Sequence, residues 1–378
     1  MNLGNGQKIG VLGGGQLGLM LMEAAAGFNV ELYFLDPDPN APCAQFESNF
    51  TLGDFKDEKD VIAFAKGKDL ITIEIENVNT QALRSIVKEG IQVYPSPDLI
   101  ETIKDKGLQK EFYRKHQIPT SPFQLCENEK AYQEAIHSFP SVQKLRTGGY
   151  DGRGVQIVKS EEDFKDLFKA PSILEDFVPF EQEISVIVAR NTEGEIKTFP
   201  TVGMQFNEEA NLVEFLFSPA DLSDEVEEKA QFIANKVAEA FNLVGIMAVE
   251  MFLTKDGQIL VNESAPRPHN SGHQSIEGNE TSQYEQHLRA IIGLPLGGTE
   301  ITKPSVMVNL LGAKGYEGEV RYLGINELET ESEVFVHLYG KKKTRPFRKL
   351  GHITVLAESI EDAKEKAMSA KEIVQCVA

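Results

Sequence analysis

Short apolar runs alternate with amphipathic segments along the first hundred residues. Stretches with helical spacing separate four such runs, KIGVLG, VELYFLD, DLITIEIEN and IQVYP. Because strands that alternate with helices in one sheet run parallel and connect by right-handed crossovers, the pattern predicts a small parallel α/β sheet. We expect two of its helices near 57–66 and 79–88. Ser96-Pro97 has the residue order of a helix start and opens one predicted helix that ends before Pro119, so a domain boundary lies near residue 95.

The hydrophobic pattern changes after this boundary, where strands and short helices mix irregularly. This mixture favours an α+β arrangement over a doubly wound sheet. A long helical stretch near 223–241 precedes two apolar strands, GIMAVEMFL and QILVNES, which a turn at Asp256-Gly257 joins. From about residue 299 to the end, we expect a smaller, strand-rich unit that closes with a helix.

Composition narrows the class of protein. The chain has 378 residues, of which 41% are hydrophobic and 25% charged, so several domains with sizeable cores are expected. Its formal net charge of −20 argues against a nucleic-acid partner. Three widely spaced cysteines favour a reducing compartment without disulfides. No secretory pattern opens the chain, and no apolar run approaches the roughly 18 residues of a membrane span, so we expect a cytoplasmic protein without a membrane partner.

The first apolar run leads into VLGGGQLG, which contains Gly13-x-Gly15-x-x-Gly18 before a helical segment. Glycines at this spacing admit positive φ and close ligand approach, and the following helix offers unpaired N–H groups to a phosphate. Asp36 ends the next run, eighteen residues after Gly18, near the distance of a ribose-binding acid. One interpretation is therefore an NAD-dependent oxidoreductase. Against it, Asp36 begins DPDPNAP, a stiff turn with three prolines where an NAD ribose would need room.

A second glycine-rich segment runs from Lys144 to Gly154, with four glycines in its last seven residues and a lysine at the end of the preceding strand. Such a loop can fold its N–H groups over phosphates while the lysine supplies charge. By its spacing it is neither a Walker A loop nor a kinase loop. The alternative is an ordinary glycine-rich hairpin.

The two apolar strands around Asp256-Gly257 bring two acids together. If these residues form a two-residue type I′ turn, Glu250 faces Glu263, and the same face carries the apolar residues Ala248, Phe252, Ile259 and Val261. Directly opposed like charges are destabilising and require a cation. Two carboxylates that leave other positions open suit Mg²⁺ with water and phosphate oxygens. In this register Asn262 points to the other face of the sheet, unless the strand bulges there. The alternative to a metal site is a solvated rim of the sheet, where the two acids merely lie side by side.

Two polar clusters follow these strands. The loop APRPHNSGH carries Arg267, His269, Asn270 and His273, donors that suit a small planar anion such as bicarbonate, whereas no ligand spacing supports zinc. Further on, YGKKKTRPFRKLGH places six basic residues among the nine that end at Lys349. This cluster predicts a phosphate clamp, with a solvated hairpin face or a localisation signal as alternatives.

Taken together, these motifs resemble the ATP-grasp enzymes, and closely the N5-carboxyaminoimidazole ribonucleotide synthases of purine biosynthesis. The similarity covers nearly the whole chain and rests on the order of GGGQLG, EIEN, RTGGYDGRG, ILEDFVPFEQE, VEMF with VNE, APRPHNSGH, TSQYEQHLRA and YGK with RKLGH. It implies a homodimer built from three domains. These are a Rossmann-like domain over 1–95, an ATP-grasp domain over 96–298 with a lid over about 120–178, and a small β-rich C-terminal domain over 299–378.

The resemblance also implies a role for each candidate residue. Lys106 and Lys144 would lie near the ATP phosphates, and Glu250 and Glu263 would hold Mg²⁺, or alternatively Mn²⁺. The implied ATP-binding set is Lys106, Lys144, Gly149, Tyr150, Asp151, Gly152, Arg153, Gly154, Val155, Glu175, Asp176, Phe177, Val178, Glu183, Phe206, Asn262 and Glu263. The residues implied to act on bicarbonate and its activated form are Arg267, His269 and Asn270, with Tyr150, Asp151 and Arg153 nearby. Those implied to bind 5-aminoimidazole ribonucleotide are Gly15, Gln16, Leu17, Glu76, Lys341, Arg348 and Lys349.

The implied reaction is the ATP- and bicarbonate-dependent N-carboxylation of 5-aminoimidazole ribonucleotide. Bicarbonate would be activated as carboxyphosphate, and the amine would attack either this species or CO₂ released from it. The alternatives are a different ATP-grasp ligase, such as the formate-dependent glycinamide ribonucleotide formyltransferase, the NAD-dependent oxidoreductase above, and a nucleotide sensor without turnover.

Four residues depart from the common pattern of the family. Phe206 stands where a histidine near ATP is common, Val155 replaces a glutamine and Gln274 replaces a tryptophan. Lys106 replaces an arginine and keeps its charge without the planar fork. None of these changes removes a predicted metal ligand.

Overall fold

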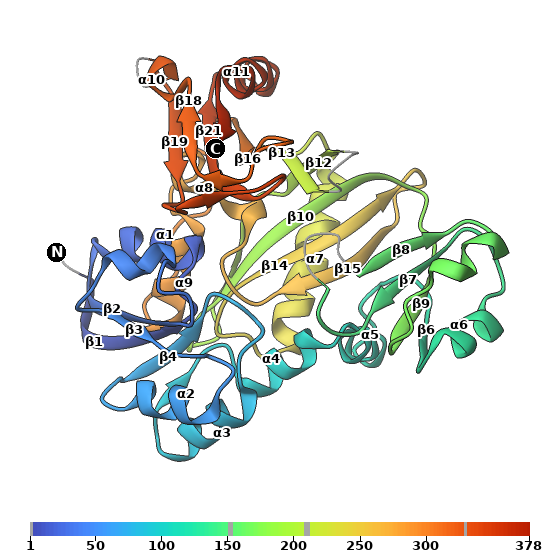
Figure 1. Ribbon diagram of the computed structural model, residues 1–378, viewed down its shortest axis with the longest axis horizontal. Coiled ribbons are helices and arrows are strands. Elements are labelled where there is room, and N and C mark those ends of the chain that lie inside the picture. The colour runs from blue at the N-terminus through green and yellow to red at the C-terminus, as the bar shows by residue number, and fades with distance from the viewer. Residues whose placement is uncertain (1–2, 150–153, 208–211, 329–330) are drawn as a thin grey trace.

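A five-stranded parallel sheet forms the N-terminal part of the protein, in the strand order β3-β2-β1-β4-β5 (Figure 1). The computed structural model describes residues 3–149, 154–207, 212–328 and 331–378. The parallel α/β unit predicted from the alternating pattern is confirmed. Its elements are β1 (Leu3–Leu12), α1 (Gln16–Ala25), β2 (Phe28–Asp36), η1 (Pro42–Gln45), β3 (Phe50–Leu52), α2 (Glu58–Ala65), β4 (Leu70–Ile73), α3 (Thr80–Lys88) and β5 (Gln92–Val93).

The segment after Ser96 forms two helices instead of the single predicted one. Ser96 caps α4 (Pro97–Lys104) as predicted, since its hydroxyl accepts a hydrogen bond from an N–H of the first turn at 3.3 Å. The backbone then becomes extended at Asp105, whose carboxylate accepts hydrogen bonds from two N–H groups at the start of α5 (Lys106–Lys115). Because an N-cap of this kind begins a new helix, Lys106 lies at the first position of α5.

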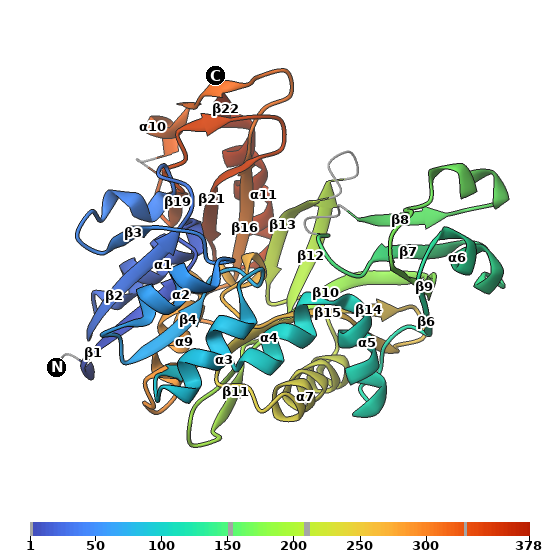
Figure 2. The same cartoon turned by 60° about the horizontal axis from the view of Figure 1, so that its bottom comes forward.

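A separate four-stranded antiparallel sheet lies at one end of the molecule, to the right in Figures 1 and 2. Its strand order is β6-β9-β7-β8, and it falls within the range predicted for the lid. Its elements are β6 (Phe123–Cys126), α6 (Glu129–Ala135), β7 (Ser141–Leu145), β8 (Val155–Val158), η2 (Glu161–Asp166) and β9 (Ser172–Asp176). Tyr132 of α6 packs with Cys126, Val158, Leu167 and Leu174, so this sheet has a small core of its own.

A nine-stranded sheet runs through the middle of the molecule and into its C-terminal part. The strand order is β15-β14-β10-β12-β13-β16-β21-β19, with β11 beside β10. Its first elements are β10 (Phe180–Arg190), β11 (Ile196–Thr198), β12 (Val202–Asn207), β13 (Leu212–Ser218), α7 (Asp224–Ala240), β14 (Gly245–Thr254), β15 (Ile259–Ala265), η3 (Asn270–Gly272), α8 (Ser275–Gly278) and α9 (Gln283–Ile291).

The unit after residue 299 continues this sheet, because β16 pairs antiparallel with β13. Its elements are β16 (Ser305–Leu311), β17 (Gly318–Glu319), β18 (Arg321–Leu323), α10 (Ile325–Leu328), β19 (Val334–Leu338), β20 (Lys343–Thr344), β21 (Lys349–Leu356), α11 (Ile360–Ile373) and β22 (Gln375–Val377). The smaller unit that we predicted is therefore strand-rich and closes with a helix, but it shares its sheet with the preceding part of the chain. The domain boundary near residue 298 stays a prediction.

Helices with small residues on one face cover the large sheet. Helix α7 buries Ala230, Ile233, Ala234, Val237 and Ala238 in the core beside β10 and β14. In the same way, α11 buries Ala363, Ala367 and Ala370 beside β16 and β21. Alanines at such spacing form a narrow apolar stripe, which lets a helix pack closely on a sheet. In the described part of the chain, no helix is both long and apolar enough to cross a bilayer.

The hairpin β14–β15 has the predicted pairing of Glu250 with Glu263, but not the predicted turn. Near the turn Leu253 pairs with Ile259, one residue away from the register that a two-residue turn requires. A bulge between the Glu250 and Met251 pairs then restores the predicted register at the acids. As a result, Ile259 and Val261 lie in the core on the α7 side and not on the face of Glu250, where we predicted them. A bulge adds one residue to one strand and reverses the faces beyond it.

Helix α9 joins the N-terminal sheet to the large sheet. Tyr284, Leu288 and Ile291 of α9 share one core with residues of α1, and the helix also contacts β14. His287 lies fully buried at this junction, with Nε2 3.0 Å from the hydroxyl oxygen of Thr72 on β4. Burial lowers the pKa of the His287 ring to about 4, so the ring is neutral in the folded protein at neutral pH.

Acid should destabilise the protein through His287. Because the pKa of this ring is about 4 in the folded protein and about 6.5 in an unfolded chain, its stabilising contribution is complete above pH 6.5 and is lost as the pH falls toward 4. Between pH 7.5 and pH 5, we expect the free energy of unfolding to fall by about 2 kcal/mol more than in His287→Gln, which cannot titrate. Urea denaturation of both proteins at the two pH values measures the difference, and a constant gap would contradict it.

Candidate active site

Two acids face each other at one end of the large sheet. Glu250 on β14 pairs with Glu263 on β15, and the next strand, β10, carries Glu183. Burial, followed by the charges of Glu263 and Glu183, raises the pKa of Glu250 to about 8. Burial also raises the pKa of Glu183 to about 7. The arrangement therefore penalises negative charge at each of these two carboxylates and favours a nearby cation.

Lys106 supplies one such cation. Its Nζ contacts Oε2 of Glu263, and its charge lowers the pKa of that carboxyl to about 2. Among the residues with described placement, no three His, Cys, Asp or Glu side chains form a complete metal site. The donors present are two opposed carboxylates and the amide oxygen of Asn262 on the same strand as Glu263. This set fits Mg²⁺, which usually keeps water and ligand oxygens as its other ligands.

Two lysines bind one buried carboxylate beside the acids. Nζ of Lys144 is 3.1 Å from Oε2 of Glu175, and Nζ of Lys110 is 3.3 Å from Oε1. Although burial alone raises the pKa of Glu175, the charges of Lys110 and Lys144 lower it to about 2. Lys144 also donates a hydrogen bond to Oδ1 of Asn262 at 2.7 Å. Lys144 thus links Glu175 to the strand that carries Glu263.

Sequence reasoning missed Lys110. Its side chain is 2% exposed and donates hydrogen bonds to the hydroxyls of Thr120 at 2.6 Å and Ser121 at 3.0 Å. Burial lowers the pKa of its ammonium group to about 8. The available signal was spacing, since residues four apart on a helix share a face and Lys106 was already a candidate.

The predicted adenine segment, Glu175 to Val178, connects the lid sheet to the large sheet between β9 and β10. Val178 is buried and Phe177 is exposed. The two lysines hold the side chain of Glu175, and its backbone lies in β9 between Phe123 of β6 and Val142 of β7. Asp176 lies 3.2 Å from Nε2 of His137, and Phe206 packs against the core around Met204. The roles of these residues in binding ATP stay predictions.

Four candidates of the glycine-rich loop, Tyr150, Asp151, Gly152 and Arg153, lie outside the described residues. The loop is anchored on both described sides of them. Gly154 has a φ of +78° and its carbonyl accepts a hydrogen bond from the N–H of Leu145 at 2.8 Å. Val155 begins β8 and pairs with Lys144. Gly149 and Gly154 therefore both lie between β7 and β8, whose pairing joins Lys144 to Val155.

The predicted anion loop lies beside the acid pair. Nδ1 of His269 is 3.7 Å from Oε1 of Glu250. Nε of Arg267 is 2.8 Å from Oε1 of Glu76, which follows β4 in the N-terminal sheet. The loop therefore spans the junction between the two sheets, with a cation at one end and an imidazole at the other.

The side chains of Asn270 and His273 in this loop make hydrogen bonds within the protein. The amide of Asn270 exchanges two hydrogen bonds with the amide of Asn309 on β16, each at 2.9 Å. His273 is buried and lies 3.1 Å from both Nε2 of Gln283 and the hydroxyl of Tyr284. Burial keeps its pKa well below the usual range. Both side chains hold the loop in place, and the contact of Asn270 with an anion stays a prediction.

A side chain of the protein occupies the N-terminal glycine turn. The carboxylate of Glu74 accepts hydrogen bonds from the N–H groups of Gly15 at 2.6 Å and Gly18 at 2.9 Å. The carboxylate of Asp36 accepts another from Gly14 at 2.8 Å. A dinucleotide pyrophosphate would meet these acids where the NAD interpretation requires unpaired N–H groups. The turn therefore does not favour NAD.

Two further predicted residues follow this turn. Gln16 and Leu17 begin α1, and Leu17 is 8% exposed. Burial raises the pKa of the nearby Glu74 carboxyl to about 7, although the hydrogen bonds from the turn oppose the shift.

The basic cluster of the C-terminal part lies between the sheets. Nζ of Lys341 donates a hydrogen bond to the carbonyl of Lys349 at 2.8 Å. The guanidinium of Arg348 donates one to the carbonyl of Lys343 at 2.6 Å. The charge of Lys349 opposes the rise in the pKa of Glu250, so this lysine acts on the acid pair. Binding of a phosphate by this cluster stays a prediction.

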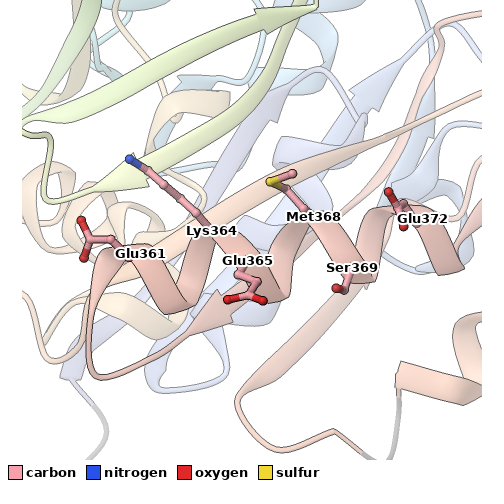
Figure 3. A pocket seen from close by; sticks show the side chains of 6 residues that line it. All are labelled: Glu361, Lys364, Glu365, Met368, Ser369 and Glu372. Atoms are coloured by element: carbon pink, nitrogen blue, oxygen red, sulfur yellow. The ribbon is translucent and has the colours of Figure 1, made fainter.

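A shallow hollow lies on the outer face of α11, away from the acid pair (Figure 3). All of its lining side chains come from this one helix, and they are Glu361, Lys364, Glu365, Met368, Ser369 and Glu372. Such a mixed, solvated helix face offers no convergent set of donors. The acid pair with its lysines is therefore the candidate active site.

Three family models match successive parts of the chain. The ribonucleotide synthetase preATP-grasp domain matches residues 6–104, the ATP-grasp domain matches 111–284, and the phosphoribosylaminoimidazole carboxylase C-terminal domain matches 305–366. The ATP-grasp match includes both acids, Glu175 and Lys144, whereas Lys106 and Lys110 lie just before its first residue.

Two curated relatives match nearly the whole of this chain. The N5-carboxyaminoimidazole ribonucleotide synthase of Bacillus subtilis is 37% identical over 93% of this chain and 92% of its own length. The phosphoribosylaminoimidazole carboxylase of Ogataea methanolica is 40% identical over 95% of this chain and 68% of its own length.

Solved structures agree in fold. N5-carboxyaminoimidazole ribonucleotide synthetase from Thermotoga maritima has a TM-score of 0.89 at 43% identity, over 98% of this chain and 99% of its own. The Aspergillus clavatus synthase in complex with ADP and 5-aminoimidazole ribonucleotide has a TM-score of 0.88 at 34% identity, over 98% of each chain. This chain therefore belongs to the N5-carboxyaminoimidazole ribonucleotide synthase family of ATP-grasp enzymes.

Proposed function

We propose that this ATP-dependent ligase carboxylates the exocyclic amine of 5-aminoimidazole ribonucleotide in purine biosynthesis, with bicarbonate as the source of the carboxyl group. The observation that carries the proposal is the pairing of Glu250 with Glu263 next to Lys106 and His269. A phosphate-binding region and an anion-binding loop thus meet at one place. The Aspergillus clavatus relative, whose complex holds ADP and 5-aminoimidazole ribonucleotide, supports the choice of substrate.

The triphosphate would be held by positive charge on one side of the acids. Lys106 and Lys144 are close enough to the acid strand to neutralise phosphate oxygens, and Glu175 keeps Lys144 in place. Glu250, Glu263 and the amide oxygen of Asn262 would hold Mg²⁺, and Mn²⁺ accepts the same oxygen ligands. When bound, such an ion neutralises charge on the phosphoryl group that is transferred.

Bicarbonate would be held by Arg267 and His269 beside the terminal phosphate. An oxygen of bicarbonate attacks the γ-phosphorus, the bond from that phosphorus to the ADP oxygen breaks, and carboxyphosphate forms. The amine nitrogen then attacks the carboxyl carbon, either of carboxyphosphate or of CO₂ released from it, and phosphate leaves with the electron pair of the broken C–O bond. The amine loses a proton, and the products are the N-carboxylated nucleotide, ADP and phosphate. Asn270 would also contact the anion, because its pair with Asn309 uses only one of its two amide N–H groups.

The acceptor nucleotide would lie between the N-terminal turn and the basic cluster. Gly15, Gln16, Leu17 and Glu76 would face its ribose and base, while Lys341, Arg348 and Lys349 would bind its 5′-phosphate. Support comes from position, because Arg267 already joins Glu76 to the anion loop. Tyr150, Asp151 and Arg153 remain candidates for excluding water from the activated carboxyl group.

We also propose that the protein forms a homodimer and is located in the cytoplasm. The three cysteines, Cys43, Cys126 and Cys376, are buried and form no disulfides, which supports a reducing compartment.

Turnover of ATP should require both the nucleotide acceptor and bicarbonate. We expect phosphate release to rise at least tenfold when 5-aminoimidazole ribonucleotide and bicarbonate are added together, because the acceptor consumes the activated carboxyl group. Replacing bicarbonate by formate, or the acceptor by glycinamide ribonucleotide, should leave release at its basal rate. Release stimulated by the formate pair instead would support the formyltransferase alternative.

Removing either acid charge should stop the reaction without unfolding the protein. Glu250→Gln and Glu263→Gln keep the side-chain shape but lose a carboxylate, and we expect each to lower kcat by about two orders of magnitude or more. Glu228→Gln, the same change at an exposed position of α7, serves as the control. Circular dichroism checks folding, and near-normal turnover in either active-site variant would refute the metal assignment.

Lys110 should matter for stability and for ATP binding together. Lys110→Met leaves the buried carboxylate of Glu175 with one cationic partner, and we expect a loss of about 3–5 kcal/mol in the free energy of unfolding. The KM for ATP should also rise, since Glu175 then no longer holds Lys144 as firmly. Lys115→Met, at an exposed position of α5, is the matched control. A variant with wild-type stability would show that Lys110 does not stabilise this buried charge.

A further inference from the structure

The glycine turn between β1 and α1 has an unusual occupant. In Rossmann-like domains the N–H groups at this helix N-terminus bind the phosphates of a ligand. Here both carboxylate oxygens of Glu74 are bound there, Oε1 by the N–H of Gly15 at 2.6 Å and Oε2 by the N–H of Gly18 at 2.9 Å. Glu74 itself follows β4, the neighbour of β1, and its own N–H donates to the carbonyl of Leu12 at 3.0 Å. The chain thus supplies an anion from the next strand.

The glycines of the turn make room for this carboxylate. A Cβ atom at Gly13 would lie 2.5 Å from Cγ of Glu74, and one at Gly15 would lie 2.8 Å from its Oε1. Both distances are shorter than side chains tolerate, and Gly13 also has a φ of +102°. Contact with Glu74 therefore explains the first two glycines of the spacing, whereas a Cβ atom at Gly18 would approach Cys43 and Phe34.

The same segment reaches the anion loop two residues later. Glu76 binds Nε of Arg267 at 2.8 Å, while Glu74 binds the turn. Arg267 also acts on Glu74, because its charge opposes the rise in the pKa of that carboxyl. One short segment, 74–76, therefore contacts both loops that the proposed function assigns to the acceptor and to bicarbonate.

We propose that Glu74 is a positioning residue, whose carboxylate replaces a ligand phosphate at the N-terminus of α1 and holds the turn so that Gln16 and Leu17 face the acceptor nucleotide. This inference rests on the proposed function, since it assumes that the acceptor lies against the turn. Without the carboxylate, the N–H groups of Gly15 and Gly18 lose a charged partner. The turn then becomes free to adopt other conformations, and the acceptor binds less often to the competent one.

Steady-state kinetics of Glu74→Gln and Glu74→Ala test the inference. We expect the KM for 5-aminoimidazole ribonucleotide to rise about tenfold or more in both variants, with the KM for ATP within about twofold of the native value. Glu89→Gln, an exposed acid after α3, is the control for the loss of one charge. A merely structural role would change the two KM values together or change stability alone, and either result would overturn the inference.

Chemical rescue sharpens the test. Glu74→Ala removes the carboxylate and leaves the N–H groups of the turn exposed to an added anion. Acetate should then lower the KM for the acceptor in Glu74→Ala, while chloride at equal ionic strength should not. Neither salt should change the KM in the native protein, where Glu74 already fills the position. Equal effects of acetate and chloride would contradict a carboxylate-specific role.

Gln16→Ala separates this inference from the function on which it rests. If Gln16→Ala raises the KM for the acceptor but Glu74→Ala and Glu74→Gln do not, the turn binds the acceptor and the role of Glu74 is wrong. If all three variants keep the native KM, the acceptor does not lie against the turn, and both the location of the acceptor and the inference fail. The stimulated release of phosphate by the native enzyme tests the reaction independently of either outcome.

Discussion

The repulsion between Glu250 and Glu263 is the constraint around which the rest of the site is built. Two opposed carboxylates on neighbouring strands disfavour each other's charge, and partial burial increases the penalty. Lys106 at the start of α5 offsets this penalty by direct contact with Glu263, and the charge of Lys349 acts on Glu250 from the C-terminal part. The site therefore favours cations before any substrate arrives, which suits it to a metal-bound triphosphate.

The lysines in turn depend on local features of their helices and strands. Asp105 caps α5, which makes Lys106 the first residue of that helix. A capping interaction therefore decides where this cation lies. Lys144 is held by Glu175, whose own burial is tolerable because Lys110 provides a second positive charge. The partner of Lys144, Glu175, is thus itself held by Lys110 and by a hydrogen bond from the hydroxyl of Ser121.

Local patterns predicted most elements and the pairing of the acids, whereas contacts between distant segments were not predictable. The hairpin illustrates both cases, because the turn differs from the predicted one and a bulge compensates for it, which brings Glu250 opposite Glu263. Contacts such as Glu74 to Gly15, 59 residues apart, leave no periodic trace in a sequence. The pair of Asn270 with Asn309, 39 residues apart, is of the same kind.

The way in which strands are shared between the parts of the molecule constrains how the enzyme can move. The basic cluster follows β19 and leads into β21, both in the sheet that carries Glu250, so backbone hydrogen bonds tie the cluster to the acids. The four-stranded sheet over 123–176 has a core of its own, but Lys144 bonds to Asn262 on β15 and Arg146 pairs with Asp105 before α5. Any movement of this sheet relative to the acids would break these two polar links, while the strands that flank the basic cluster stay joined to Glu250, so the cost of such a motion falls on the side of Lys144.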